Sequence, residues 1–95
     1  MDDRFVLVNM TDVENCVYLF SGVCRMLLKQ DPKTPDEMTR FLALHQICLD
    51  LVDTIVEIER RPDAKHLAQE VANGRNAYHQ LQEKVCEVRV RSQKR

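Results

Sequence analysis

The chain has 95 residues, the length of one domain, and fourteen basic and fifteen acidic side chains give it a net charge of −1. Hydrophobic residues make up 44% and charged residues 31% of it, a balance typical of a folded domain and not of a disordered one. Two glycines and three prolines are too few for a turn-rich β-sandwich. The longest apolar region, residues 16–28, is interrupted by Ser21, Gly22 and Arg25, and a bilayer-spanning helix needs about 20 apolar residues. We expect one domain without a membrane span or secretory signal, and self-association would help to stabilise so short a chain.

The cysteines indicate a reducing compartment. Cys16, Cys24, Cys48 and Cys86 are separated by 8, 24 and 38 residues, so no C-x-x-C pair and no zinc-finger spacing is present. Each lies within an apolar pattern of helical period, where a free cysteine behaves as a small buried hydrophobe. We therefore expect reduced core thiols and a cytoplasmic protein.

Residues 1–10 are expected to form an extended arm on the bundle, with a strand over residues 5–8 as the alternative. Thr11 and Glu14 have the spacing of a capping box, in which Thr11 is the N-cap of the helix that follows. Apolar residues at helical spacing then predict a helix over about 12–30. Pro32 disfavours helix in the residue before it and ends this element.

A second helix is predicted over about 35–60. Thr34 has the features of an N-cap, Pro35 suits the first helical position, and Asp36 and Glu37 suit the positive end of the helix dipole. Its polar residues form one stripe: Asp36, Arg40, Gln46, Asp50, Asp53 and Glu57. Nearly all other positions are apolar, an arc wider than one neighbouring helix can cover. This arc predicts contact with both other helices and with a second chain.

The third predicted helix covers about 62–90 and begins at Pro62. Its apolar positions follow a 4-3 spacing, the heptad seam: Leu67, Val71, Gly74, Tyr78, Leu81, Val85 and Val88. Glycine often ends a helix, so a break at Gly74 is one interpretation. The apolar phase is unbroken across Gly74, which favours a continuous helix.

Together these elements predict an all-α fold, a small antiparallel three-helix bundle that dimerises through its first two helices. The domain covers residues 11–90, and a basic tail covers 91–95. Residues 31–60 contain three basic and seven acidic groups, and residues 61–95 contain eight basic and four acidic groups. The acidic second helix and the basic third helix are complementary neighbours within one bundle or between antiparallel chains.

Few residues have the spacing of a catalytic or metal site. Asp50, Asp53 and Glu57 share one helix face, as do the carboxylate pairs of MazG-type nucleotide pyrophosphohydrolases, to which the pattern bears a partial resemblance. The second acidic pair of that pattern is missing, since Asn73 follows Glu70 at the third position. Two pairs have the i, i+3 spacing of metal ligands but lack further ligands: His45 with Cys48, and Asp63 with His66. No catalytic motif is present, so we predict a protein that is not an enzyme and has no cofactor or metal.

The apolar excess instead favours a helical protein–protein interaction module, an adaptor, inhibitor or regulatory subunit that also self-associates. We expect the homodimer interface at four apolar residues of the second helix: Phe41, Leu44, Ile55 and Ile58. We expect a protein partner at four polar residues of the same helix: Arg40, Asp50, Asp53 and Glu57. The first alternative is a regulator that contacts nucleic acid through its basic C-terminal end: Arg89, Arg91, Lys94 and Arg95. The second alternative, which the partial resemblance implies, is a MazG-like Mg²⁺-dependent nucleotide hydrolase that uses Asp50.

Overall fold

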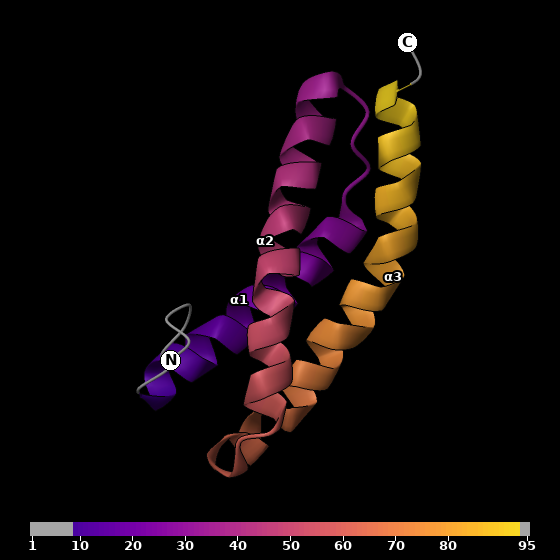
Figure 1. Cartoon of the computed structure of the whole chain (residues 1–95). Helices are drawn as coiled ribbons and strands as arrows, with labels where there is room; N and C mark the ends of the chain where they lie inside the picture. The colour runs from indigo at the N-terminus through magenta and orange to yellow at the C-terminus, as the bar shows by residue number, and fades with distance from the viewer. Residues whose placement is uncertain (1–8, 94–95) are drawn as a thin grey trace.

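The computed structural model describes residues 9–93, which form three α-helices that pack against one another. They are α1 (Met10–Lys29), α2 (Pro35–Glu59) and α3 (Ala68–Gln93), and the short 3-10 helix η1 (Pro62–Leu67) leads into α3. Figure 1 shows α2 and α3 running in opposite directions side by side, while α1 crosses behind them at an angle. The predicted all-α three-helix fold is confirmed. Residues 1–8 of the expected arm, with the alternative strand over 5–8, and the last two residues of the basic tail lie outside the described part of the chain.

Helix α1 begins earlier than the sequence pattern indicated. Its N-cap is Asn9, whose side chain accepts a hydrogen bond from the backbone N–H of Asp12 at 2.9 Å. Thr11 lies inside the first turn, so the prediction of Thr11 as the cap is wrong, and Met10 belongs to the helix and not to an arm. The physical reason is packing: beginning the helix at Asn9 places Met10 in the first turn, where its side chain packs against the core.

The start of α2 is the predicted capping box. The Thr34 hydroxyl accepts from the backbone N–H of Glu37 at 3.1 Å, and the Glu37 carboxylate accepts from the backbone N–H of Thr34 at 3.1 Å. That carboxylate also accepts from the N–H of Lys33, and these hydrogen bonds lower the pKa of Glu37. The helix ends at Glu59 with Arg60 as its C-cap, close to the expected end.

Helix α3 runs through Gly74 without a break, as its apolar phase predicted. Pro62 begins η1, and Ala64 departs from helical geometry there (φ −111°, ψ 19°), so the regular helix starts only at Ala68. The heptad seam is buried apart from Tyr78, which is partly exposed. None of the three helices, within the residues described, is long and apolar enough to cross a bilayer.

The core lies between the three helices, and its two largest side chains are Phe20 of α1 and Phe41 of α2. Three of the four residues predicted for the homodimer interface belong to this core: Phe41 and Ile55 are 0% exposed and Ile58 is 1% exposed. Their assignment to a surface is therefore wrong. The reason is that α1 and α3 together cover most of the apolar arc of α2, so these side chains are buried within one chain. Leu44, the fourth residue predicted for the interface, is partly exposed.

The two glycines lie in very different surroundings. A Cβ at Gly74 would meet the Phe20 ring at 3.0 Å and the Cα and Cβ of Ser21 at 3.2 Å, because α1 passes directly over this point of α3. A Cβ at Gly22 would meet nothing within 4 Å. Neither glycine has a positive φ, so backbone conformation does not distinguish them. Gly74 differs from Gly22 because it is closely packed.

We therefore expect alanine to have opposite effects at the two positions. Gly22→Ala should raise the free energy of unfolding by about 0.5–1 kcal/mol, the helix preference of alanine over glycine. Gly74→Ala should lower it by about 1–2 kcal/mol, because displacing α1 costs more than the helix preference returns. Urea unfolding followed by circular dichroism measures both, and an equal gain at the two sites would show that α1 does not pack tightly on α3.

Candidate interaction surface

One flank of α1 faces α3 and the opposite flank does not. On the α3 side, the Ser21 hydroxyl donates to the Glu70 carboxylate, and the Leu28 carbonyl accepts from the Lys84 ammonium at 2.7 Å. Successive helical residues are rotated by about 100°. Leu19, Val23 and Met26 therefore point away from the side of α1 that carries these contacts with α3. Their spacing of i, i+4 and i+7 aligns them in one stripe along α1, and Met26 lines a pocket with Gly22, Arg25 and Lys29 of the same helix.

Helix α2 has a matching flank. The side chains of His45 and Glu59 face α3, where Glu59 forms an ion pair with Arg75 at 2.6 Å. Leu44 and Ile47 lie on the other side of the helix, toward α1, and Leu44 lines a pocket together with Gln30 at the end of α1. Helices α1 and α2 pack against each other, and the shared pocket places Leu44 beside the C-terminal end of α1.

We call these residues the α1–α2 face: Leu19, Val23, Met26, Leu44 and Ile47. Leu19 is 51%, Met26 41% and Ile47 40% exposed, while Val23 and Leu44 pack partly against the core. Five large hydrophobic side chains of the described residues are exposed, and three of them lie on this face. The other two, Tyr18 and Val90, lie on the opposite flank of α1 and on α3. The sequence does contain a signal for the α1 part of the face. Leu19, Val23 and Met26 are apolar residues beside the buried positions of α1, so they make the apolar side of this helix wider than its buried side.

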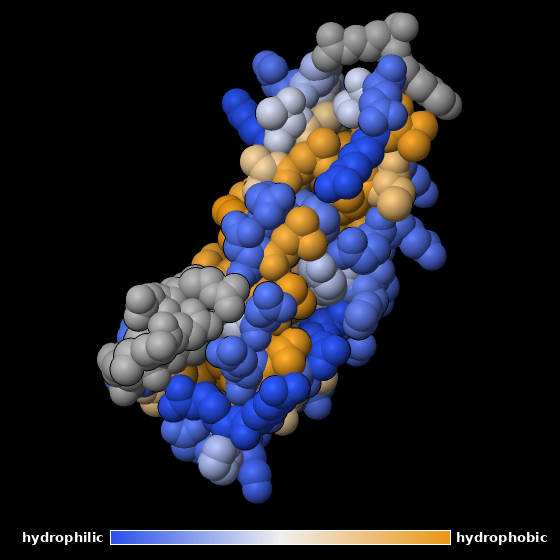
Figure 2. Space-filling model, viewed as in Figure 1, coloured by the Kyte–Doolittle hydropathy of each residue, from blue (hydrophilic) through white to orange (hydrophobic). Residues whose placement is uncertain are grey.

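A second apolar stripe lies on the side of α2 that flanks α3 and is less exposed. Figure 2 shows it as a broken band over α2 and the groove beside α3, with hydrophilic side chains around it. Its residues are all partly buried: Leu42, Leu49, Val52 and Val56. The wide apolar arc of α2 is thus divided between the core, the α1–α2 face and this stripe.

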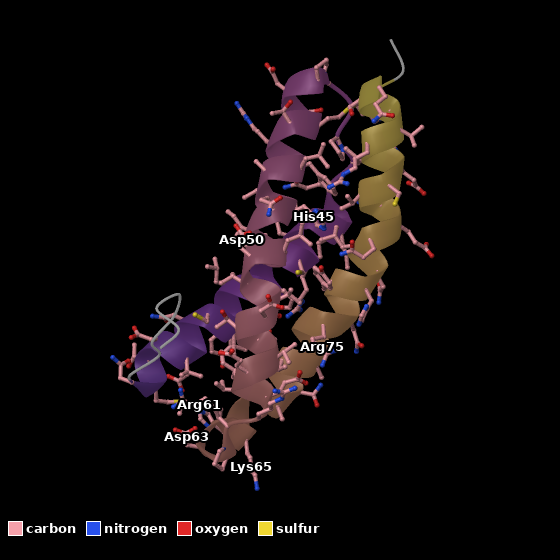
Figure 3. All side chains as sticks on the ribbon, viewed as in Figure 1. His45, Asp50, Arg61, Asp63, Lys65 and Arg75 are labelled. Atoms are coloured by element: carbon pink, nitrogen blue, oxygen red, sulfur yellow. The ribbon has the colours of Figure 1, made fainter. Side chains whose placement is uncertain are left out.

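The polar residues predicted to bind a partner are all exposed: Arg40, Asp50, Asp53 and Glu57. Arg40 lies two helical turns before Ile47, and Asp50 lies one turn after it. Asp53 lies farther around α2, and Glu57 lies two turns beyond Asp50. Asp50 accepts a hydrogen bond from Gln46 at 3.0 Å. In Figure 3, Asp50 projects on the opposite side of α2 from His45, which points toward α3.

The basic C-terminal residues are partly engaged within the chain. Arg91 donates to Asp31 at 3.2 Å and to the carbonyl of Pro32 at 3.0 Å, and it lies 3.9 Å from Glu87. Arg89 is exposed. Lys94 and Arg95 lie outside the described residues. Of the four residues predicted to contact nucleic acid, Arg91 is thus hydrogen-bonded to the loop between α1 and α2.

The two candidate pairs of metal ligands are separated from each other. His45 and Cys48 are both buried, and the Cys48 sulfur is 3.3 Å from the sulfur of Cys24. Asp63 is held by Arg61 at 2.8 Å, which lowers the pKa of Asp63, and His66 contacts Glu14 at 3.2 Å. Within residues 9–93, no three side chains of His, Cys, Asp or Glu are grouped to hold a metal ion.

Burial holds His45 in its neutral form. The side chain is 2% exposed, its ring stacks on that of Tyr78, and its Nε2 lies 3.4 Å from the amide nitrogen of Gln82. That amide nitrogen can only donate, so Nε2 is the acceptor and the ring proton lies on Nδ1, which has no hydrogen-bond partner among the described residues. Burial, followed by the positive charge of Arg89, lowers the pKa of His45.

We expect His45 to make the fold less stable in mild acid. A histidine with a lowered pKa in the folded state binds fewer protons than in the unfolded chain, so stability is complete above the unfolded pKa of about 6.5 and falls as the pH drops below it. The slope should approach, and not exceed, about 1.4 kcal/mol per pH unit between pH 6.5 and 5.5. Urea unfolding at each pH tests this: His45→Gln should flatten the slope, and His79→Gln, at an exposed position, should leave it intact. A slope unaffected by His45→Gln would assign it to other groups.

Comparison with known protein families, with curated proteins and with solved structures finds no match for this chain. Its function is therefore argued from the exposed surface and the buried polar groups described above. Of the large hydrophobic side chains exposed within residues 9–93, Leu19, Met26 and Ile47 belong to the α1–α2 face.

Proposed function

We propose that the chain is a non-enzymatic protein–protein interaction module that binds a second copy of itself through the α1–α2 face. The observation that carries the proposal is the exposure of three large apolar side chains on two helices that pack against each other, Leu19 and Met26 on α1 and Ile47 on α2. An apolar patch of this kind loses contact with water when a partner covers it. The four cysteines are free thiols, which supports a reducing, cytoplasmic setting for the module.

A second copy fits this face because the charges beside it are self-complementary. A two-fold contact brings the same surface of two copies together in opposite directions. When two α2 helices meet in this way near Leu44 and Ile47, Arg40 of one copy lies opposite the segment of the other that contains Asp50. Each copy then contributes one cation and one anion, and this arrangement fixes the register of the two helices.

The remaining acidic residues of α2 are compatible with this arrangement. Asp53 lies around the helix from Ile47, and Glu57 lies two turns beyond Asp50 along α2, so both stay in water when the contact near Leu44 and Ile47 is covered. They are the residues through which a further protein partner could be recognised once two copies are joined, as the polar stripe of α2 suggested. The module would then present an acidic surface on each side of the dimer.

The solution mass is the first test. We expect a dimer by size-exclusion chromatography with light scattering, and a monomer for Ile47→Asp or Leu19→Asp, since a buried aspartate at the centre of an apolar contact opposes association. Tyr18→Asp is the matched control, because Tyr18 is 57% exposed on the other flank of α1 and should leave the dimer intact. A wild-type monomer at the highest soluble concentration would contradict self-association.

The register of the dimer is tested by a charge exchange. Arg40→Glu should weaken the dimer about tenfold, because it places two acidic groups opposite each other at both ends of the contact. Combining it with Asp50→Arg should restore most of the lost affinity, whereas combining it with Asp53→Arg should not. Sedimentation equilibrium of the four proteins measures this. Equal rescue by the two arginines would show a general charge effect and would exclude the proposed register.

A further inference from the structure

Two cysteines from different helices meet in the core. Cys24 lies in α1 and Cys48 in α2, 24 residues apart in the chain, and both side chains are 0% exposed. Their sulfur atoms are 3.3 Å apart, and the Cys24 thiol donates a hydrogen bond to the Cys48 sulfur. The pair lies where α1 crosses α2, so a bond between the two sulfurs would join the helices at their crossing.

We propose that Cys24 and Cys48 form a reversible oxidation site, at which hydrogen peroxide converts the two thiols into a disulfide between α1 and α2. A disulfide bond is about 2.05 Å long, so each sulfur has to move by well under 1 Å from its present position. Side-chain rotation of two small residues can supply such a movement. This inference does not depend on self-association, because both thiols belong to one chain.

The hydrogen bond between the thiols gives them different roles. By donating its proton toward Cys48, Cys24 stabilises the thiolate form of Cys48 and so lowers the pKa of Cys48, while its own pKa is raised. The Cys48 thiolate is therefore the group that attacks peroxide. Cys16 is a poorer nucleophile, since burial and the neighbouring Asp12 raise its pKa.

The reaction proceeds in two balanced steps. The Cys48 sulfur attacks one peroxide oxygen and breaks the O–O bond, which gives a sulfenic acid on Cys48 and releases hydroxide, and this hydroxide takes up the proton that Cys48 lost. The Cys24 sulfur then attacks the Cys48 sulfur, the S–O bond breaks, and the hydroxyl leaves with the Cys24 proton as water. In total, two thiols lose two electrons and two protons, and one peroxide is reduced to two waters.

Burial sets the conditions under which the site reacts. Both thiols are covered, so peroxide reaches them when the helices open locally. Cys86 is exposed and meets oxidants first. For this reason the experiment uses the full chain with Cys16→Ser and Cys86→Ser, substitutions at positions outside the fully buried core, which leaves Cys24 and Cys48 as its two thiols.

The test is oxidation of this two-thiol chain with hydrogen peroxide, followed by intact mass measurement and a tryptic digest without reductant. We expect the monomer to lose two hydrogen atoms, and the peptide ending at Arg25 to be linked to the peptide of residues 41–60. Dithiothreitol should reverse both changes. Because the bridge closes a loop of 24 residues, thermal unfolding of the oxidised chain should shift upward by about 10 °C.

Three results would overturn the assignment: two free thiols after treatment, bridges between chains only, or an oxidised chain that unfolds at the same or a lower temperature. Cys24→Ala in the same background is the control, and it should form no bridge within one chain and should not lose two hydrogen atoms. Circular dichroism establishes that this control is folded. If it is not, iodoacetamide labelling of the two-thiol chain in denaturant, before and after peroxide and with the loss of two hydrogen atoms as the mass criterion, decides the question alone.

Discussion

The close passage of α1 over α3 at Gly74 determines how the rest of this small protein is arranged. With only hydrogen at that position, Phe20 and Ser21 lie directly against α3. This contact sets the rotation of α1 about its own axis: Phe20 enters the core, and Ser21 turns toward Glu70 of α3. Leu19 and Met26, on the stripe that also contains Val23, are then left exposed on the outer side of α1. One contact therefore determines both how the core is filled and which apolar residues remain exposed.

Much of the fold could be predicted because its signals are local. Thr34, Pro35 and Glu37 lie within a single turn, and each favours the same helix start, so α2 begins where its sequence indicates. At α1 the local signal was ambiguous, because Asn9 and Thr11 are both good N-caps. The packing of Met10 against the core decided between them, and that contact involves residues far along the chain.

The candidate site could be predicted only in part, for a geometric reason. Helical periodicity showed that Phe41, Ile55 and Ile58 belong to an apolar arc, but it does not show whether the same chain or another one covers that arc. The answer depends on the angle at which α1 crosses α2, and this angle is set by contacts between the helices. The meeting of Cys24 with Cys48 depends on the same crossing, so sequence spacing gave no sign of it.

The C-terminal half of α3 also holds the end of α1 and the segment that follows it. Lys84 binds the carbonyl of Leu28, and Arg91 binds the carbonyl of Pro32 and the carboxylate of Asp31. The Leu28 carbonyl, near the helix end, lacks an intrahelical partner, so a cation from another helix serves as its hydrogen-bond donor. Arg91 is therefore already engaged within the chain. A polyanion that took it up would withdraw it from the α1–α2 loop, so binding of phosphate at this end and ordering of the loop are thermodynamically linked and oppose each other.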